Sequence, residues 1–526
     1  MKKVILVVLA VFLVGLVSCV KDKTTGPHIE VSDIYISDQD TVLYPKLGEE
    51  FVFDPSDRIS QTDPSCSLTY QWRYGKIYVS AKGEYMVHPQ DSLKMLSNDK
   101  VLRFTFDRQE PYFARLRVSN EFGCAYRYFI VKPSSNFDEG LVMLSRNDEG
   151  DAMFSVQNTV TDEIELVQKE ASDFWYRTSE DVPVLKDDIV DFAFVCGGGD
   201  VWFPRVGYPY ILSRKNKQAY YLDHNTLRVI TGFEFSGTPL KLGMCGVGKF
   251  DLFAFCDDGD MRVQTWNWQM EVERKVFKDV HHWDRFQRVK IRSGIERNST
   301  FLDILFLHDD ENSKLYGIWA DGLSNSGIGP EAYPGEKVIY AIPFETANIG
   351  VHDFYIVTQN IENPSKITIR QVSDVGYTGS MYLLFGLYNV VSSYTYDLPE
   401  GEELTLTPEA QVLNVYQHRS ILYNTDRKIY MWKPGASTEP KLPTEESELC
   451  FDVTSVNPNA VITCMTQDIT NKYVFVGVYD PTAEGERKGS VYVLDSFDLS
   501  LLKKWEHVAY KPMNMYYKLH LLRTDY

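Results

Sequence analysis

The residue types that usually carry catalysis are present, but not in the spacings of common catalytic motifs. The 526-residue chain has no His-Glu-x-x-His, no Gly-x-Ser-x-Gly, no phosphate loop and no dinucleotide fingerprint. Cys196-Gly-Gly-Gly-Asp200 offers backbone amides to an anion, but a hairpin turn explains it better. His281-His282-Trp283-Asp284 contains two metal-ligand residue types, yet adjacent side chains on a strand point to opposite faces. We predict no catalytic residue and no metal site.

Acidic runs offer a second kind of chemistry. Asp257-Asp258-Gly259-Asp260 and His308-Asp309-Asp310-Glu311-Asn312 present oxygen ligands of the kind that calcium takes, but neither has EF-hand spacing. Acidic turns between strands are the favoured interpretation of both. Glycosidase chemistry needs two carboxylates about 5–10 Å apart. With 73 acidic residues such a pair stays open, although no motif points to one.

Tryptophans are the main candidates for ligand binding. Trp266 and Trp268 are two residues apart and would share one face of a strand, and Trp202 and Trp283 fall near predicted loops. Such rings stack on sugars or fill pockets for peptide side chains. Trp319 and Trp432 lie in predicted hairpin strands, where we expect core packing instead.

Composition limits the partners. The chain carries 54 basic and 73 acidic residues, a formal charge of −19, and has no extended basic run, which disfavours nucleic acid. Its length favours two or more domains. The eight cysteines form no Cys-x-x-Cys pair and no zinc-type cluster with histidine, so no metal cofactor is expected.

The amino terminus resembles the signal of bacterial lipoproteins. A basic start precedes the fourteen-residue apolar run Val4 to Val17, which is too short to span a bilayer, and Leu16-Val17-Ser18-Cys19 matches a lipobox. The resemblance implies cleavage after residue 18 and acyl lipid on Cys19 as the only membrane anchor. An ordinary secretory signal is the alternative. Residues 19–28 then form a tether.

Residues 29–134 show short runs of β type separated by turn residues. Several runs alternate apolar and polar residues, which predicts a β-sandwich with Trp72 as the central core aromatic. The clearest strand candidates are 51–53, 68–74, 84–87, 101–106, 112–118 and 125–131.

This segment resembles the Ig-like fold of polycystic-kidney-disease (PKD) domains. The resemblance rests on Tyr70-Gln-Trp72-Arg-Tyr74-Gly75 and on Arg117-Val-Ser-Asn120-Glu-Phe122-Gly123-Cys124, which matches the Val-x-Asn-x-Phe-Gly turn of the family. Asn120 and Gly123 suit that turn because both tolerate unusual backbone angles. The usual Trp-Asp-Phe-Gly-Asp-Gly loop is missing, which indicates a divergent member. A disulfide between Cys66 and Cys124 is a candidate cross-link of this domain.

Residues 136–526 consist of recurring strand hairpins. These hairpins begin near residues 141, 189, 250, 302, 353, 420 and 461, about 55 residues apart on average. Propeller blades need about 40–50 residues, so the spacing predicts a seven-bladed β-propeller with long loops. Six or eight blades, or a stacked pair of β-sandwiches, also fit the loose repeat.

The order of these parts resembles the PKD-like family lipoproteins of Bacteroidetes. Its most specific points are Cys19, Tyr70-Gln-Trp72, Asn120-Glu-Phe-Gly123 and Gly140-Leu-Val-Met-Leu-Ser145. The resemblance implies an outer-membrane protein that faces the exterior and captures or presents an oligomeric nutrient beside a SusC-like TonB-dependent transporter and a SusD-like lipoprotein. The single acid Asp22, between lysines, matches the surface-export signal of such lipoproteins in part. A surface hydrolase or lyase and a protein-only scaffold are the alternatives.

Overall fold

The computed structural model describes the chain from residue 31 to residue 518. Gaps in this description fall at 39–40, 47–48, 80–84, 88–92, 107–111, 134–138, 159–161, 168–187, 197–206, 223–226, 228, 246–250, 266–269, 272–282, 294–299, 319–325, 328–331, 346–351, 375–387, 448–449 and 469. Cys19 and the predicted signal and tether lie outside the described residues.

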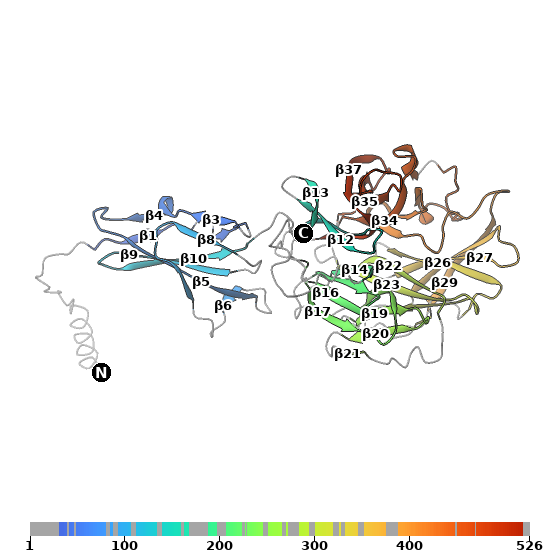
Figure 1. Cartoon of the computed structure of the whole chain (residues 1–526), viewed down its shortest axis with the longest axis horizontal. Helices are drawn as coiled ribbons and strands as arrows, with labels where there is room; N and C mark the ends of the chain where they lie inside the picture. Colours follow the sequence, from blue (N-terminus) through green and yellow to red (C-terminus); the bar gives the residue numbers. More distant parts are fainter. Residues whose placement is uncertain are drawn as a thin grey trace, which may run out of the picture.

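The first ten strands form a β-sandwich (Figure 1). Its larger sheet has the order β2-β10-β9-β5-β6, with β7 also paired to β5, and the pairs β1–β4 and β3–β8 lie over one face. The strands are β1 (Ile34–Ile36), β2 (Val42–Leu43), β3 (Glu50–Phe53), β4 (Ile59–Gln61), β5 (Thr69–Val79), β6 (Tyr85–Val87), β7 (Lys94–Ser97), β8 (Leu102–Thr105), β9 (Tyr112–Ser119) and β10 (Cys124–Val131), with a 3-10 turn η1 (Ser56–Arg58).

Aromatic packing joins the two layers of the sandwich. Trp72 on β5 is fully buried, as the sequence predicts. Phe53 on β3 contacts Trp72 and Phe129 edge to face, with ring centroids 5.9 and 5.4 Å apart. Residues 112–119 of β9 alternate between buried and half-buried, so one side of the sheet packs on the core and the other faces outward.

The turn between β9 and β10 is held by one side chain. Asn120 Oδ1 accepts the backbone N–H groups of Phe122 (2.9 Å) and Gly123 (3.0 Å), and Asn120 Nδ2 donates to the Ser32 carbonyl (2.9 Å). Neither Asn120 nor Gly123 has a positive φ. The turn therefore does not use the tolerance of these two residues for unusual backbone angles, and side-chain hydrogen bonds of Asn120 fix it instead.

The remaining strands form seven four-stranded antiparallel sheets in the described part of the chain. Each of the seven hairpin starts expected from the sequence falls in a different one of these sheets. The strands of the first four sheets are β11 (Gly140–Arg146), β12 (Ala152–Asn158), β13 (Glu163–Val167), β14 (Ile189–Cys196), β15 (Gly207–Ser213), β16 (Gln218–Leu222), β17 (Val229–Glu234), β18 (Pro239–Cys245), β19 (Asp251–Cys256), β20 (Met261–Thr265), β21 (Met270–Glu271), β22 (Arg285–Ser293), β23 (Thr300–Asp309), β24 (Lys314–Ile318) and β25 (Ser326–Gly327). Those that follow are β26 (Glu336–Glu345), β27 (His352–Asn360), β28 (Lys366–Asp374), β29 (Tyr388–Asp397), β30 (Val412–Val415), β31 (Ser420–Asn424), β32 (Lys428–Trp432), β33 (Cys450–Asp452), β34 (Val461–Gln467), β35 (Tyr473–Tyr479), β36 (Gly489–Asp495), β37 (Leu501–Ala509) and β38 (Lys511–Lys518), with 3-10 turns η4 (Tyr416–His418), η5 (Pro434–Ala436) and η6 (Val453–Ser455).

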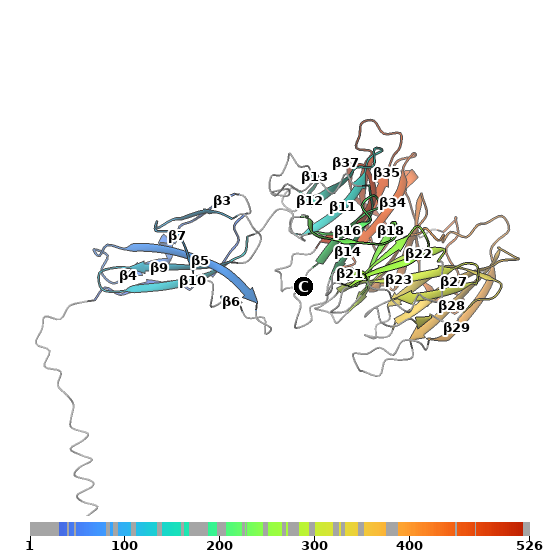
Figure 2. The same cartoon turned by 60° about the horizontal axis from the view of Figure 1, so that its bottom comes forward.

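The first sheet joins the two ends of this region. The last strand, β38, pairs antiparallel with β11, so that Gly140 lies opposite Lys518 and Arg146 lies opposite Lys511. The sheet order is β13-β12-β11-β38, while every other sheet uses four consecutive strands. This pairing closes the array of sheets. Figure 2 shows the array from a second side.

Each of these sheets is packed between two neighbours. On β31, Ile421 belongs to an apolar cluster with residues of β27, and the next residue, Leu422, belongs to a cluster with residues of β35. On β35, Val476 joins that second cluster, and Phe475 joins a third cluster with Leu141 and Met515. Successive side chains on a strand point to opposite faces, so both faces are buried. The region is an all-β, propeller-type array.

Candidate functional site

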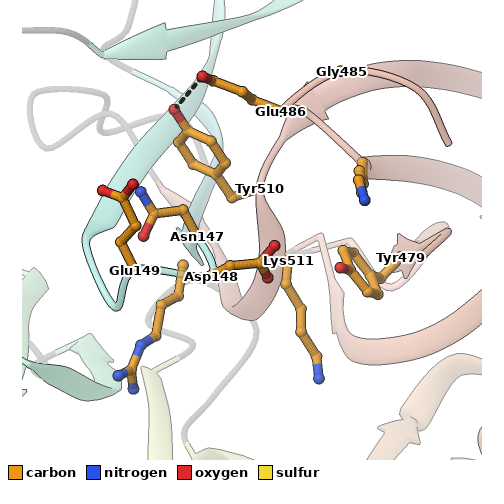
Figure 3. Close-up of a pocket in the computed structure, with 10 residues that line it drawn as sticks. Asn147, Asp148, Glu149, Tyr479, Gly485, Glu486, Tyr510 and Lys511 are labelled. Atoms are coloured by element: carbon orange, nitrogen blue, oxygen red, sulfur yellow. Dashed lines mark hydrogen bonds between the residues drawn. The ribbon is translucent and has the colours of Figure 1, made fainter. Parts of the chain in front are cut away.

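The candidate site is a cavity beside the strand pair that closes the array (Figure 3). Its volume is about 390 Å³. Three segments line it: the β11–β12 turn, the β35–β36 connection and the β37–β38 junction. The lining residues are Arg146, Asn147, Asp148, Glu149, Tyr479, Gly485, Glu486, Lys488, Tyr510 and Lys511.

Local hydrogen bonds fix the β11–β12 turn. Asn147 Oδ1 accepts the Asp151 backbone N–H (2.8 Å), and the Asn147 N–H donates to the Asp151 carbonyl (2.9 Å). Gly150 has a φ of +91°, and a Cβ there would lie 2.9 Å from Arg146 Nη2. Glycine is therefore required at this position, and the turn holds Asp148 and Glu149 exposed at its tip.

The opposite wall depends on a close backbone approach. A Cβ at Gly489 would lie 1.9 Å from the Tyr510 carbonyl oxygen, so only glycine lets β36 begin against the β37–β38 junction. Tyr510 Oη donates to Glu486 Oε2 at 3.5 Å, the bond drawn in Figure 3. Lys511 Nζ lies 5.6 Å from the ring centroid of Tyr479, a cation–π contact.

Both tyrosines of the cavity keep their phenol protons at neutral pH. Burial raises the pKa of Tyr479, and the Asp148 and Asp480 carboxylates raise it further. Burial likewise raises the pKa of Tyr510, with Glu486 adding to it. Each phenol therefore offers an O–H donor on the edge of an aromatic ring.

A second cavity, of about 610 Å³, continues from the first. It shares Arg146, Asn147, Asp148 and Lys511. Its other lining residues are Asp426, Val461, Ile462, Thr463, Pro512 and Met513. We call the two cavities together the loop-face groove, because they lie where the β11–β12 and β31–β32 turns meet the first residues of β34 and β38.

The loop-face groove has the chemistry of a polar-ligand site. Tyrosine rings provide stacking surfaces, carboxylates accept hydroxyl or amide protons, and Lys488 and Lys511 are cations near them. Arg146 is already engaged, because its Nη2 donates to Asp188 Oδ1 at 2.8 Å. The lining residues include no histidine, cysteine or serine that would act as a base or a nucleophile.

The tryptophan candidates do not form this groove. Trp283 is 2% exposed and packs among Phe253, Phe286 and Leu305. A ring buried in this way cannot stack on a ligand, so the prediction that Trp283 is a ligand platform is corrected. Trp202, Trp266 and Trp268 lie outside the described residues, as does Trp319. Trp432 is buried against Tyr355, in agreement with the core role expected for it.

The disulfide prediction is also corrected. Cys66 and Cys124 are both free thiols, one half-buried and the other exposed. Cys124 lies opposite Ser119 at the start of β10, and Cys66 lies in the loop before β5. The two cysteines therefore stay separate, and the sandwich is held by its aromatic core and hydrogen-bonded turns.

One arginine pairs with acids of each of the two acidic runs. Arg262 pairs with Asp258 and with Asp260 at 2.7 Å each, and Arg285 pairs with Asp310 at 2.6 Å. Asp309 accepts hydrogen bonds from Asn312. Within the described ranges no three His, Cys, Asp or Glu residues gather closely enough to hold a metal ion. Residues 257–260 and 310–312 lie in the turns between strands, whereas His308 and Asp309 are the last residues of β23, so the interpretation of both runs as turns is confirmed only in part.

Sequence reasoning missed the groove residues. Tyr479 and Tyr510 each lie at a strand end with a proline two residues later, at 481 and 512. That repeated pattern is a weak signal of an aromatic residue held at a strand end. The pairing of β11 with β38, which brings Asp148 near these tyrosines, has no local signature.

Comparisons with known proteins find distant structural matches. No protein-family model matches the chain, and neither does any curated protein. A quinonprotein alcohol dehydrogenase-like protein from Bacteroides thetaiotaomicron is 11% identical, with a TM-score of 0.39 over 92% of this chain and 97% of that one. The β-propeller domain of Cps50 (Swd1) from Myceliophteria thermophila is 11% identical, with a TM-score of 0.36 over 60% and 87%. The Dos1 propeller is 10% identical, with a TM-score of 0.35 over 70% and 84%.

No helical segment of the described chain has the length and the apolar character that a transmembrane helix requires.

Proposed function

We propose that this chain is a lipid-anchored surface accessory protein that binds an oligomeric nutrient for a Sus-type, TonB-dependent outer-membrane importer. The observation that carries the proposal is the loop-face groove. It combines two tyrosines, four carboxylates and two lysines on strand ends and turns, which suits the hydroxyls or amides of a glycan or a peptide.

The proposed architecture has three parts. Acylated Cys19 anchors the chain, a divergent PKD-like sandwich acts as a spacer, and a seven-bladed β-propeller presents the groove. The seven four-stranded sheets and their closure through β11 and β38 support the propeller. The Asn120–Gly123 turn and the buried Trp72 support the PKD-like assignment. A SusC-like transporter and a SusD-like lipoprotein are the proposed partners.

The charge arrangement of the groove favours holding a ligand over cleaving it. A glycosidase needs a carboxyl group that donates a proton to the leaving oxygen beside a second carboxylate. Glu486 instead accepts the Tyr510 hydroxyl, and Asp148 sits at an exposed turn tip beside lysine. These carboxylates are placed as hydrogen-bond acceptors in contact with solvent.

A binding experiment with matched variants tests the groove. The purified chain is screened on glycan and peptide arrays, and the strongest ligand is titrated by calorimetry against Tyr479→Ala and Tyr510→Ala. Loss of a stacking ring costs about 1–1.5 kcal/mol, so we expect about tenfold weaker binding for each variant.

Phe497→Ala is the matched control. Phe497 is also an exposed aromatic ring beside a lysine, with Lys433 Nζ 5.8 Å from its centroid, but it lies at the β36–β37 turn. The Phe497→Ala variant should bind the ligand with the same affinity as the wild type. Equal affinity of the wild type and both tyrosine variants would remove the groove as the binding site.

A further inference from the structure

The outward face of the larger sandwich sheet concentrates positive charge. Arg115 and Arg117 on β9 and Arg73 on β5 all point away from the core that Trp72 and Leu116 fill. Arg73 lies directly opposite Arg115 in the β5–β9 register. Like charges directly opposite each other destabilise a sheet, so this arrangement opposes folding.

The three arginines have no carboxylate partner among the residues that the structure describes. No ion pair in the described part of the chain involves Arg73, Arg115 or Arg117, and the buried Nε–H group of each has no acceptor there. The chain as a whole has 73 acidic residues and a charge of −19. A basic cluster left unpaired on such an acidic protein is available to an anion from outside.

Aromatic rings are interleaved with these cations. Tyr126 lies opposite Arg117 and Tyr128 lies opposite Arg115 on β10, and both rings are nearly half exposed. The guanidinium carbons of Arg115 and Arg117 lie 5.3 and 5.9 Å from the centroid of Tyr126. These contacts hold the guanidinium groups beside the rings, so charge and stacking surface are presented together. We call Arg73, Arg115, Arg117, Tyr126 and Tyr128 the arginine face.

The dimensions of the arginine face suit a chain-like ligand. It spans three neighbouring strands, about 10 Å at the usual strand spacing, and two residue rows about 7 Å apart. A stable protein interface needs about 800 Å² from each partner, several times this area. A few sugar rings with carboxylate substituents cover it, since arginine binds carboxylates bidentately and tyrosine stacks on rings.

We propose that the arginine face binds a polyuronate, a polysaccharide whose sugar rings carry carboxylates. This site lies on the sandwich and does not depend on the loop-face groove. The protein therefore has a charge-selective contact with glycan that is separate from the site of the proposed nutrient ligand.

The test uses the full chain and two forms of one polymer. Polygalacturonate carries free carboxylates, and its highly methyl-esterified form keeps the rings but loses the charge. We expect the wild type to bind polygalacturonate at least tenfold more tightly than the ester in affinity electrophoresis or calorimetry. The double variant Arg115→Gln/Arg117→Gln should lose at least tenfold in affinity for polygalacturonate.

Matched variants separate this site from the groove and from misfolding. Arg103→Gln removes an arginine of the other layer, whose Nη1 lies 3.2 Å from Glu50, and should leave binding unchanged. Tyr479→Ala in the groove should also leave polygalacturonate binding unchanged. The melting temperature of the double variant should equal or exceed that of the wild type, because like-charge repulsion is relieved. The proposal would be overturned by equal affinity for the two polymers or by full binding of polygalacturonate by the double variant. It would also be overturned if no binding of polygalacturonate were detected, as expected if the occupant of this face is an acidic protein.

Discussion

Replacing Arg288 by alanine should lower the free energy of unfolding of the propeller-type region by about 3–5 kcal/mol. Arg288 on β22 makes a bidentate ion pair with Asp191 on β14, with distances of 2.8 and 3.2 Å. The two side chains are 18% and 12% exposed. Removal of the guanidinium leaves a largely buried carboxylate without its counter-charge, which is the costly way to break such a pair.

The Asp191–Arg288 pair also joins three sheets. Asp191 Oδ2 accepts the Leu242 N–H of β18 at 2.7 Å, and Arg288 donates to the Leu242 and Phe192 carbonyls. Loss of Arg288 therefore removes a donor from each of two buried carbonyl groups, which lie on β14 and β18, the first strands of two neighbouring sheets. We expect the effect to appear as reduced cooperativity between sheets as well as a lower midpoint.

Urea unfolding of the full chain, followed by tryptophan fluorescence and circular dichroism, measures this effect. Arg262→Ala is the control, because its partners Asp258 and Asp260 lie in a turn with side chains 45% and 41% exposed, so water solvates the carboxylates after the change and the loss should be about 1 kcal/mol or less. The double variant Arg288→Met/Asp191→Leu should recover most of the loss, since it leaves no unpaired charge. A change under 1 kcal/mol for Arg288→Ala would show that the pair does not join these sheets.

Acidification should lower the free energy of unfolding through His308, at pH values above those at which the aspartate and glutamate side chains of the protein take up protons. His308 is fully buried, and its pKa is lowered to about 3 by burial and by the adjacent Arg285 cation, with Asp310 opposing. Gln287 Nε2 donates to the Ala341 carbonyl, and its Oε1 accepts the Ala341 N–H. Gln287 Oε1 can therefore only accept from His308 Nε2, and Nδ1 is left to accept from Arg285.

The sign of the pH dependence follows from this arrangement. The folded state keeps His308 neutral, while the unfolded chain binds a proton near pH 6.5. The stability is therefore fully present above pH 6.5 and falls toward pH 3 by about 1.4 kcal/mol per pH unit. Between pH 8 and pH 5, His308 alone should remove about 2 kcal/mol.

Unfolding curves at pH 8, 6.5, 6, 5.5 and 5 check this expectation. The variant His308→Gln should be less stable than the wild type at pH 8, yet its stability should fall by about 2 kcal/mol less on acidification. The His308 ring protons in an NMR titration should keep their shifts down to pH 5. Parallel stability curves for the two proteins, or titration of the ring near pH 6, would contradict the buried neutral state.

Local patterns in the sequence predict the strands well. Alternation in residues 112–118 predicts β9 and its buried side, and the size of Trp72 within an alternating strand predicts its burial. The seven hairpin starts are visible because each hairpin pairs strands that are close in the sequence, most of them across a short turn. Strands that pair over a short distance along the chain can be recognised from a single sequence.

Contacts between distant segments leave no such signal. Arg262 lies two residues after Asp260, so its pairing with that acid is a local event, but Arg285 and Asp310 meet only because β22 and β23 align. Trp283 looks like a loop residue from its neighbours, and its burial depends on the facing sheets. The groove unites residues 146–149 with residues 479–511 because β38 pairs with β11.

We propose that the loop-face groove holds an oligomer without transforming it. The most direct measurement is the mass of the bound oligomer after incubation with the purified chain at 37 °C and release from it. We predict that the oligomer returns at its original mass from the wild type, and that little is retained by a Tyr479→Ala/Tyr510→Ala variant. Shortened products from the wild type, abolished by Asp148→Asn or Glu486→Gln, would contradict this claim and identify the groove as an active site.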